Sequence, residues 1–212
     1  KVYKGYTIVN TYGYKRINKV SIMQLSKDGQ KVVGSKISIS CDCLGMSGGW
    51  TPAVHLFTQS GGKLKFRDED QVFIPNIYPP NQISIGSSKG DFTLDEILTN
   101  LSKILKDFLK IDKTNYENIE VQSYFNKSKR NIWLLPSDKI IGKTKPFVDY
   151  QNDATAKDIK LALREGFRSI EHVKRYTTTG MGTDQGKLGN MHALGIVSET
   201  AGSKMGELNI FC

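Results

Sequence analysis

The first 40 residues contain three short segments with the sequence pattern of antiparallel β-strands. Segments 6–10, 19–25 and 36–40 alternate polar and apolar residues or run through β-branched ones, and both patterns are typical of strands. Asp28-Gly29 separates the second segment from the third, and this dipeptide favours a hairpin turn because both residues tolerate a positive φ. The sequence therefore predicts that the chain opens with an antiparallel meander.

Two glycine-bearing segments follow, and each precedes a predicted helix. Ser47-Gly48-Gly49-Trp50-Thr51 leads into Pro52, a residue that suits the first turn of a helix. After a predicted strand over 70–76, a second strand over 82–86 leads into Gly86, Ser87, Ser88 and Gly90. A glycine loop at a helix N-terminus presents free N–H groups to a phosphate. The two segments together suggest a nucleotide-binding scaffold, and tight turns without a ligand remain the alternative.

The second glycine segment is followed by the strongest helix signal in the chain. Thr93 and Glu96 form a capping box. The apolar residues that follow have helical spacing on one face: Ile97, Leu98, Leu101, Ile104, Leu105, Phe108 and Leu109. Residues 111–132 are polar and weakly periodic, which is typical of a linker between two units.

Three short helices are predicted in the last third of the chain. Thr155 and Asp158 form a second capping box, and Gly166 ends the helix that it opens. Ser169 caps a second helix through Tyr176, and Asn190 caps a third helix to Thr200. A glycine-rich loop, 177–189, joins the last two.

This loop carries a concentration of phosphate-binding groups. Lys174 and Arg175 stand at a predicted helix end, followed by Thr177, Thr178 and Thr179 and then by Asp184, Gln185, Gly186 and Lys187. Guanidinium, ammonium, hydroxyl and backbone N–H groups together hold phosphate well. A solvated helix end with a mobile loop is the alternative. RNA is disfavoured because only Tyr176 supplies an aromatic ring nearby.

Charge and hydropathy exclude two classes of partner. Lys and Arg number 30 against 21 Asp and Glu, which gives a formal charge of +9. A basic balance can serve nucleic acid, an anionic membrane, an acidic subunit or a phosphorylated cofactor. The cations are scattered without long like-charged blocks, which disfavours a nucleic-acid tail. The sequence contains no apolar run of about 18 residues, so we expect neither nucleic acid nor a membrane as partner.

Cysteine and histidine give no pattern of a metal or nucleophilic site. Cys41-x-Cys43 lacks the second ligand pair that a zinc site needs. With Cys212 the count is odd and small, which suits a reducing cytoplasm. His172 and His192 lack the spacing of metal ligands or of a catalytic triad. We therefore expect no catalytic residue and no metal in this chain.

Three segments resemble the alpha subunit of heterotetrameric sarcosine oxidases. They are CDCLGMSGGWTPAVHLFTQSGGKLKF, FVDYQNDATAKDIKLALREGFRSIEHVKRYTTTGMGTDQGK and GNMHALGIVSE. The resemblance implies a mixed α/β fold: part of a two-dinucleotide-binding-type flavoprotein module over 1–110, with its β-meander, a linker over 111–144 and a small helical domain over 145–212. It covers only part of such a subunit, because the N-terminal glycine fingerprint and the folate part are missing. The chain is thus expected to be a fragment.

The resemblance also implies cofactors and partners. The family oxidises sarcosine to glycine with oxygen, giving hydrogen peroxide and either formaldehyde or methylenetetrahydrofolate. The alpha subunit binds NAD, and FMN lies at the alpha–beta interface. The beta subunit carries FAD, tetrahydrofolate belongs to the folate part of the alpha subunit that is missing here, and gamma and delta subunits complete the holoenzyme. Carried over by motif, the residues expected near NAD are Ser47, Gly48, Gly49, Trp50, Thr51, Gly86, Ser87, Ser88 and Gly90. Those expected near the interfacial flavin are Lys174, Arg175, Thr177, Thr178, Thr179, Asp184, Gln185, Gly186 and Lys187.

Two other functions remain open at this point. The first is a subunit of a proline-type or opine-type dehydrogenase, for which retained iron–sulfur ligands in 145–212 would be the sign; the absence of such a cysteine cluster favours sarcosine oxidase. The second is a non-catalytic assembly module whose glycine loops bind nothing.

Overall fold

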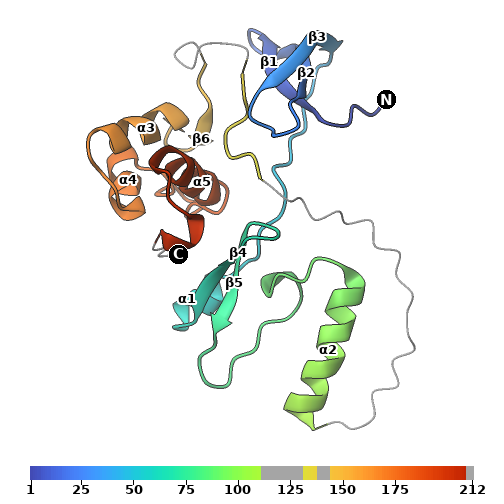
Figure 1. Ribbon diagram of the computed structural model, residues 1–212, viewed down its shortest axis with the longest axis vertical. Helices are drawn as coiled ribbons and strands as arrows, with labels where there is room; N and C mark the ends of the chain where they lie inside the picture. Colours follow the sequence, from blue (N-terminus) through green and yellow to red (C-terminus); the bar gives the residue numbers. More distant parts are fainter. Residues whose placement is uncertain (111–130, 138–143, 209–212) are drawn as a thin grey trace. The chain divides into compact units, whose positions relative to one another are not determined.

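The computed structural model describes residues 1–110, 131–137 and 144–208, and the mixed α/β fold class is confirmed (Figure 1). Two compact units divide the chain: the first contains Lys1–Ser47 and Ile132–Phe211, and the second contains Gly48–Asn131. Most of the predicted linker over 111–144 lies outside the described residues, and the predicted domain boundaries stay a prediction.

The chain opens with the predicted antiparallel meander. Strands β1 (Tyr6–Gly13), β2 (Ile17–Leu25) and β3 (Val32–Ser40) pair in the order β1-β2-β3, and Figure 1 shows them side by side in blue. Gly29 has the positive φ that the β2–β3 turn requires. Asp28 contributes its side chain instead, because Oδ1 accepts hydrogen bonds from the Ser26 hydroxyl and the Gln30 N–H.

The second unit starts with a short helix against a hairpin. Helix α1 (His55–Gln59) contacts β4 (Lys63–Arg67), which pairs with β5 (Val72–Ile77). The prediction of a helix starting at Pro52 is wrong by three residues, because Val54 is the N-cap. Strand β4 was not predicted, although its alternating Lys-Leu-Lys-Phe sequence is a strand signal.

Helix α2 (Leu94–Leu109) confirms the strongest helix signal. The capping box has both of its hydrogen bonds, from Glu96 N–H to the Thr93 hydroxyl and from Thr93 N–H to the Glu96 carboxylate. The strand predicted over 82–86 is wrong: these residues are irregular and lead into a 3₁₀ turn, η1 (Gly86–Ser88). Asn81 and Gly86, which flank this segment, take positive φ values, and the left-handed conformation of the non-glycine Asn81 is unfavourable in an extended strand.

The last third of the chain is a small helical bundle. Strands β6 (Phe147–Asp149) and β7 (Ala154–Thr155) form a hairpin that leads into α3 (Ala156–Arg164), α4 (Ile170–Thr177), α5 (Asn190–Ala201) and the 3₁₀ turn η3 (Met205–Glu207). Helix α3 contacts both α4 and α5, as Figure 1 shows in orange and red. Their core side chains are almost fully excluded from solvent: Ile159, Ala162, Val173, Ile196 and Val197.

Local signals explain where these helices begin. The predicted capping box of Thr155 and Asp158 is present, and Ser169 is the N-cap of α4 as predicted. The N-cap of α5 is Gly189 rather than Asn190. Gly195, in the middle of α5, leaves room for the side chain of Trp133, because a Cβ at position 195 would lie 2.2 Å from the indole ring. Trp133, which falls within the predicted linker, therefore packs against the core of the bundle.

Candidate functional site

The loop between α4 and α5 begins with cations at a helix end. Lys174 and Arg175 occupy the last turn of α4, and Thr178 takes the left-handed conformation that ends this helix. Cations near a helix C-terminus offset its partial negative charge. Arg175 is exposed and Lys174 is half-buried, so both can also reach a ligand in solvent.

The three threonines differ in their availability. Thr177 and Thr179 are buried, and their hydroxyls lie 2.7 Å apart while Thr177 Oγ1 also bonds the Val173 carbonyl oxygen at 2.8 Å. Thr178 is exposed, and its hydroxyl donates to the Thr177 carbonyl oxygen at 2.6 Å. Of these three threonines, only Thr178 therefore lies at the surface.

Asp149, which sequence analysis missed, holds the next part of the loop. Its side chain is buried at 6% exposure. Oδ2 accepts from Gly180 N–H at 2.7 Å and from Asn152 Nδ2 at 3.1 Å, while Oδ1 accepts from the N–H groups of Gln151 and Asn152 at 2.8 and 3.0 Å. Burial by itself raises the pKa of Asp149, but these hydrogen bonds, led by that from Gly180, leave the pKa below its ordinary value.

Two neighbours of Asp149 extend this contact along the loop. Asn152 Nδ2 also donates to the Thr178 carbonyl oxygen at 3.1 Å. Gln151 Oε1 accepts from the N–H and the hydroxyl of Thr183 at 2.5 and 2.9 Å. The turn between β6 and β7 thus binds the loop at three successive points. The sequence signal for this turn was the Asp-x-x-Asn spacing of residues 149–152, which is typical of a side chain that hydrogen-bonds to nearby backbone groups.

The loop glycines are packed rather than open. A Cβ on Gly180 would lie 2.2 Å from the Asn190 side chain, and one on Gly186 would meet the same side chain at 2.2 Å. A Cβ on Gly182 would lie 2.2 Å from Gln151 Oε1. These close approaches explain why glycine is required here, and they give the loop one defined conformation.

Asp184 and Gln185 mainly stabilise the loop. Asp184 Oδ1 accepts from Gly186 N–H at 3.1 Å, and Oδ2 accepts from Leu188 N–H at 3.4 Å. Gln185 donates its side-chain amide to the Gly182 carbonyl oxygen at 3.0 Å. Lys187 follows this turn and is exposed, just before α5, whose first turn contains no acidic residue.

The loop can accept an anion. Lys174, Arg175 and Lys187 form no ion pair with another residue in the described part of the chain. The N-terminus of α5 adds a partial positive charge near Lys187, although the Asn190 N–H donates to the Gly186 carbonyl oxygen. This donor set fits a phosphate group.

The first glycine segment does not lead directly into a helix. Ser47, Gly48, Gly49, Trp50 and Thr51 are exposed and irregular. Trp50 exposes 78% of its surface. Helix α1 begins only at His55, so these residues do not line its N-terminus as the sequence suggested.

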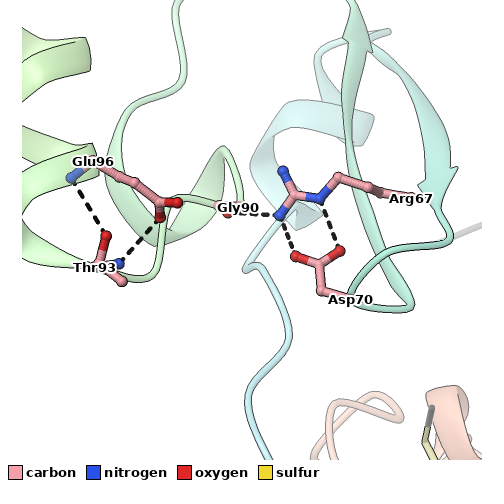
Figure 2. Close-up of polar contacts among 5 residues, drawn as sticks. All are labelled: Arg67, Asp70, Gly90, Thr93 and Glu96. Atoms are coloured by element: carbon pink, nitrogen blue, oxygen red, sulfur yellow. Dashed lines mark hydrogen bonds and ion pairs between the residues drawn. The ribbon is translucent and has the colours of Figure 1, made fainter. Parts of the chain in front are cut away.

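The second glycine segment is tied to the hairpin of the second unit. Figure 2 shows the Arg67 guanidinium forming a bidentate ion pair with Asp70 and donating to the Gly90 carbonyl oxygen at 2.7 Å. The distance from Arg67 Nε to Asp70 Oδ1 is 2.8 Å. The hydrogen bonds to Asp70 are the main cause of the raised pKa of Arg67. This cation is therefore already neutralised.

The N–H groups around Gly86 also have internal partners. Lys89 N–H and Asp91 N–H both donate to the Gly86 carbonyl oxygen, and Gly90 N–H donates to Ser87. Thr93 and Glu96 cap α2 themselves (Figure 2). Gly86, Ser87, Ser88 and Gly90 consequently form a turn that is closed by its own hydrogen bonds and contacts α2.

Two further features are absent from residues 1–110, 131–137 and 144–208. Within them, no group of three His, Cys, Asp or Glu side chains is arranged to hold a metal ion. No helix in the described part of the chain is long and apolar enough to cross a membrane.

Comparison with known proteins confirms the resemblance stated from the sequence. Residues 143–212 match the model of the sarcosine oxidase A3 domain. The sarcosine oxidase subunit alpha of Rhizobium meliloti (strain 1021) is 29% identical over an alignment of 218 residues, which covers 94% of this chain and 21% of the relative. The sarcosine oxidase subunit alpha of Corynebacterium sp. (strain P-1) is 28% identical over an alignment of 211 residues, which covers 95% of this chain and 21% of that relative. The chain spans about a fifth of the length of these relatives.

A solved structure has a similar fold. The crystal structure of L-proline dehydrogenase from P. horikoshii aligns with a TM-score of 0.54 at 20% identity, covering 96% of this chain and 41% of that one. At this identity the likeness supports the mixed α/β architecture only.

Proposed function

We infer that this chain, which is related along nearly its whole length to the alpha subunits of sarcosine oxidase, supplies cofactor-binding and subunit-contact surface to an oxidoreductase of that type. The proposed reaction converts sarcosine, water and oxygen to glycine, hydrogen peroxide and formaldehyde, or delivers the one-carbon unit to tetrahydrofolate. In this proposal the amine chemistry lies on another subunit. Proposed partners are beta, gamma and delta subunits.

The observation that carries this proposal is the 174–187 loop with its unpaired cations. We propose that Arg175 and Lys187, with Lys174 and the exposed Thr178, bind the phosphate of FMN. A flavin supplies electron acceptance and transfer to oxygen. The chain's own contribution is to hold the phosphate through charge-assisted hydrogen bonds and so to orient the cofactor.

NAD is proposed as a second cofactor, with a smaller role for this chain. The exposed Ser47–Thr51 segment can form one wall of such a site. The closed Gly86–Gly90 turn offers Ser87 as its exposed side chain and leaves the pyrophosphate to residues outside this chain. We expect NAD binding to require those residues.

Purification of the chain with its partners from the native source tests the proposal. A yellow complex that contains flavin and releases hydrogen peroxide when sarcosine is added is the expected result. The matched assay replaces Arg175 and Lys187 by Ala, with exposed Lys157→Ala of α3 as control. Loss of FMN from the double variant alone supports the assignment of the loop. A colourless chain without partners contradicts the proposal and supports a non-catalytic assembly module.

A related amino-acid dehydrogenase is the second candidate, favoured by the fold it shares with L-proline dehydrogenase. The same complex is assayed with L-proline and an artificial electron acceptor. Reduction of the acceptor by L-proline without oxidation of sarcosine would replace the first proposal by this one.

A further inference from the structure

We propose that Asp149 is a positioning residue that holds the 178–187 loop in the conformation that presents Arg175 and Lys187 to a cofactor phosphate. This inference rests on the proposed function, because that function supplies the ligand. Asp149 lies in none of the segments first assigned to cofactor binding. It acts through the loop and touches no reacting atom.

The first argument is the set of partners of the carboxylate. All four of its described hydrogen bonds come from N–H groups, and no cation pairs with it among the described residues. A buried carboxylate that is not paired with a cation costs free energy unless its lone pairs are satisfied. Charge-assisted bonds to backbone N–H groups satisfy them. The negative charge of Asp149 is thus used to bind backbone and leaves the nearby cations unneutralised.

The second argument is the position of the bonds along the chain. Through Asp149 and its turn, the β6–β7 hairpin binds Thr178, Gly180 and Thr183. These three residues lie between Arg175 and Lys187. A change in the path of the loop would therefore change the separation of the two cations, whereas the helices on either side are held by the bundle core.

The third argument is that the loop has little freedom once it is bound. Gly180 and Gly186 both pack against the side chain of Asn190, the first residue of α5. The Asp149 bond to Gly180 and the contacts with Asn190 approach the loop from two different elements. Together they fix the loop between the hairpin and the start of α5.

The experiment uses the full 212-residue chain with FMN and riboflavin as probes. The two flavins differ in the phosphate group, so the ratio of their dissociation constants isolates phosphate binding. Asp149→Asn keeps the shape of the side chain and removes its charge and two of its acceptor sites. Asp153→Asn is the matched control, because Asp153 is exposed on the same turn and has a positive φ that Asn tolerates.

Two further measurements separate positioning from loss of fold. Amide hydrogen exchange is followed for the loop and for the core of α3 and α5. Gln151→Ala is measured in parallel, because it removes the bonds to Thr183 and leaves Asp149 in place. If Asp149→Asn fails to fold, Gln151→Ala decides the outcome with the same two readouts.

We expect wild type and Asp153→Asn to bind FMN more tightly than riboflavin. In Asp149→Asn this preference falls about tenfold, equivalent to about 1.4 kcal/mol, with faster exchange in the loop and unchanged exchange in the core. An unchanged preference in Asp149→Asn overturns the inference and leaves the proposed function intact. Equal binding of the two flavins by wild type overturns both.

Discussion

The two glycine turns of this chain, Gly86–Gly90 and Thr178–Lys187, have similar compositions and opposite electrostatics. The first is held by a cation, since Arg67 binds both Asp70 and the Gly90 carbonyl oxygen. The second is held by an anion, since Asp149 binds the Gly180 N–H. The charge of Arg67 beside the first turn is already neutralised by Asp70. In the second, Arg175 and Lys187 remain available, which is why we assign phosphate binding to it.

The largest expected effect tests whether close packing around the Thr178–Lys187 turn contributes to stability. Gly186→Ala places a Cβ within 2.2 Å of Asn190 at a φ of +74°, so we expect a loss of about 2–4 kcal/mol in the free energy of unfolding. Gly202→Ala is the control, because its φ is +68° and nothing lies within 4 Å; its loss should be about 1 kcal/mol. Urea unfolding measures both, and equal losses would show that the packing contributes nothing.

The next prediction tests the difference in how the cations are used. Arg67→Ala leaves Asp70, which is 8% exposed, without its ion-pair partner and should cost about 2–3 kcal/mol of stability. Lys187→Ala removes an exposed cation and should change stability by less than about 0.5 kcal/mol. Thermal unfolding of the two variants provides the measurement. A large destabilisation by Lys187→Ala would contradict the claim that Lys187, unlike Arg67, is not used to stabilise the fold.

A third prediction concerns pH. The pKa of Asp149 is lower in the folded protein than its ordinary value of about 3.9 in an unfolded chain. Its stabilising contribution is therefore complete above that value and is lost as the pH falls through the folded pKa. Asp158 has a lowered pKa as well, mainly through the hydrogen bond with Thr155. Urea unfolding at pH 7 and pH 3 should show a smaller acid-induced loss in Asp149→Asn than in wild type.

The smallest expected effect compares the two capping boxes. In α3 the Thr155 hydroxyl donates to the Asp158 carboxylate at 2.6 Å and accepts from the Asp158 N–H at 3.4 Å, whereas in α2 the Thr93 hydroxyl accepts from the Glu96 N–H at 3.4 Å. We expect Thr155→Ala to cost about 1–2 kcal/mol and Thr93→Ala about 0.5 kcal/mol. Chemical unfolding with Thr99→Ala, an exposed position of α2, as reference measures the difference. The reverse order would show that hydrogen-bond length does not decide the strength of these caps.

Local sequence patterns determined much of this molecule. The meander, the two capping boxes and the extents of α2, α3 and α4 follow from alternation, helical spacing and cap residues, which act within a few positions of one another. The 82–86 strand was predicted wrongly for the same reason. Its β-branched residues suit a strand, but backbone conformation at Asn81 and Gly86 and the lack of a paired neighbour among the described residues leave it irregular.

What the sequence by itself determined was therefore the set of elements and the place where cations, hydroxyls and glycines gather. Only the tertiary structure decided which of these groups are free. It turned Thr177 and Thr179 inward, joined Asp149 to Gly180 across 31 residues and neutralised Arg67 next to Gly90. The physical reason is that a polar side chain bonds to whichever partner the packed fold brings within about 3 Å. When the two residues are far apart in the chain, no local sequence pattern indicates that they will be in contact.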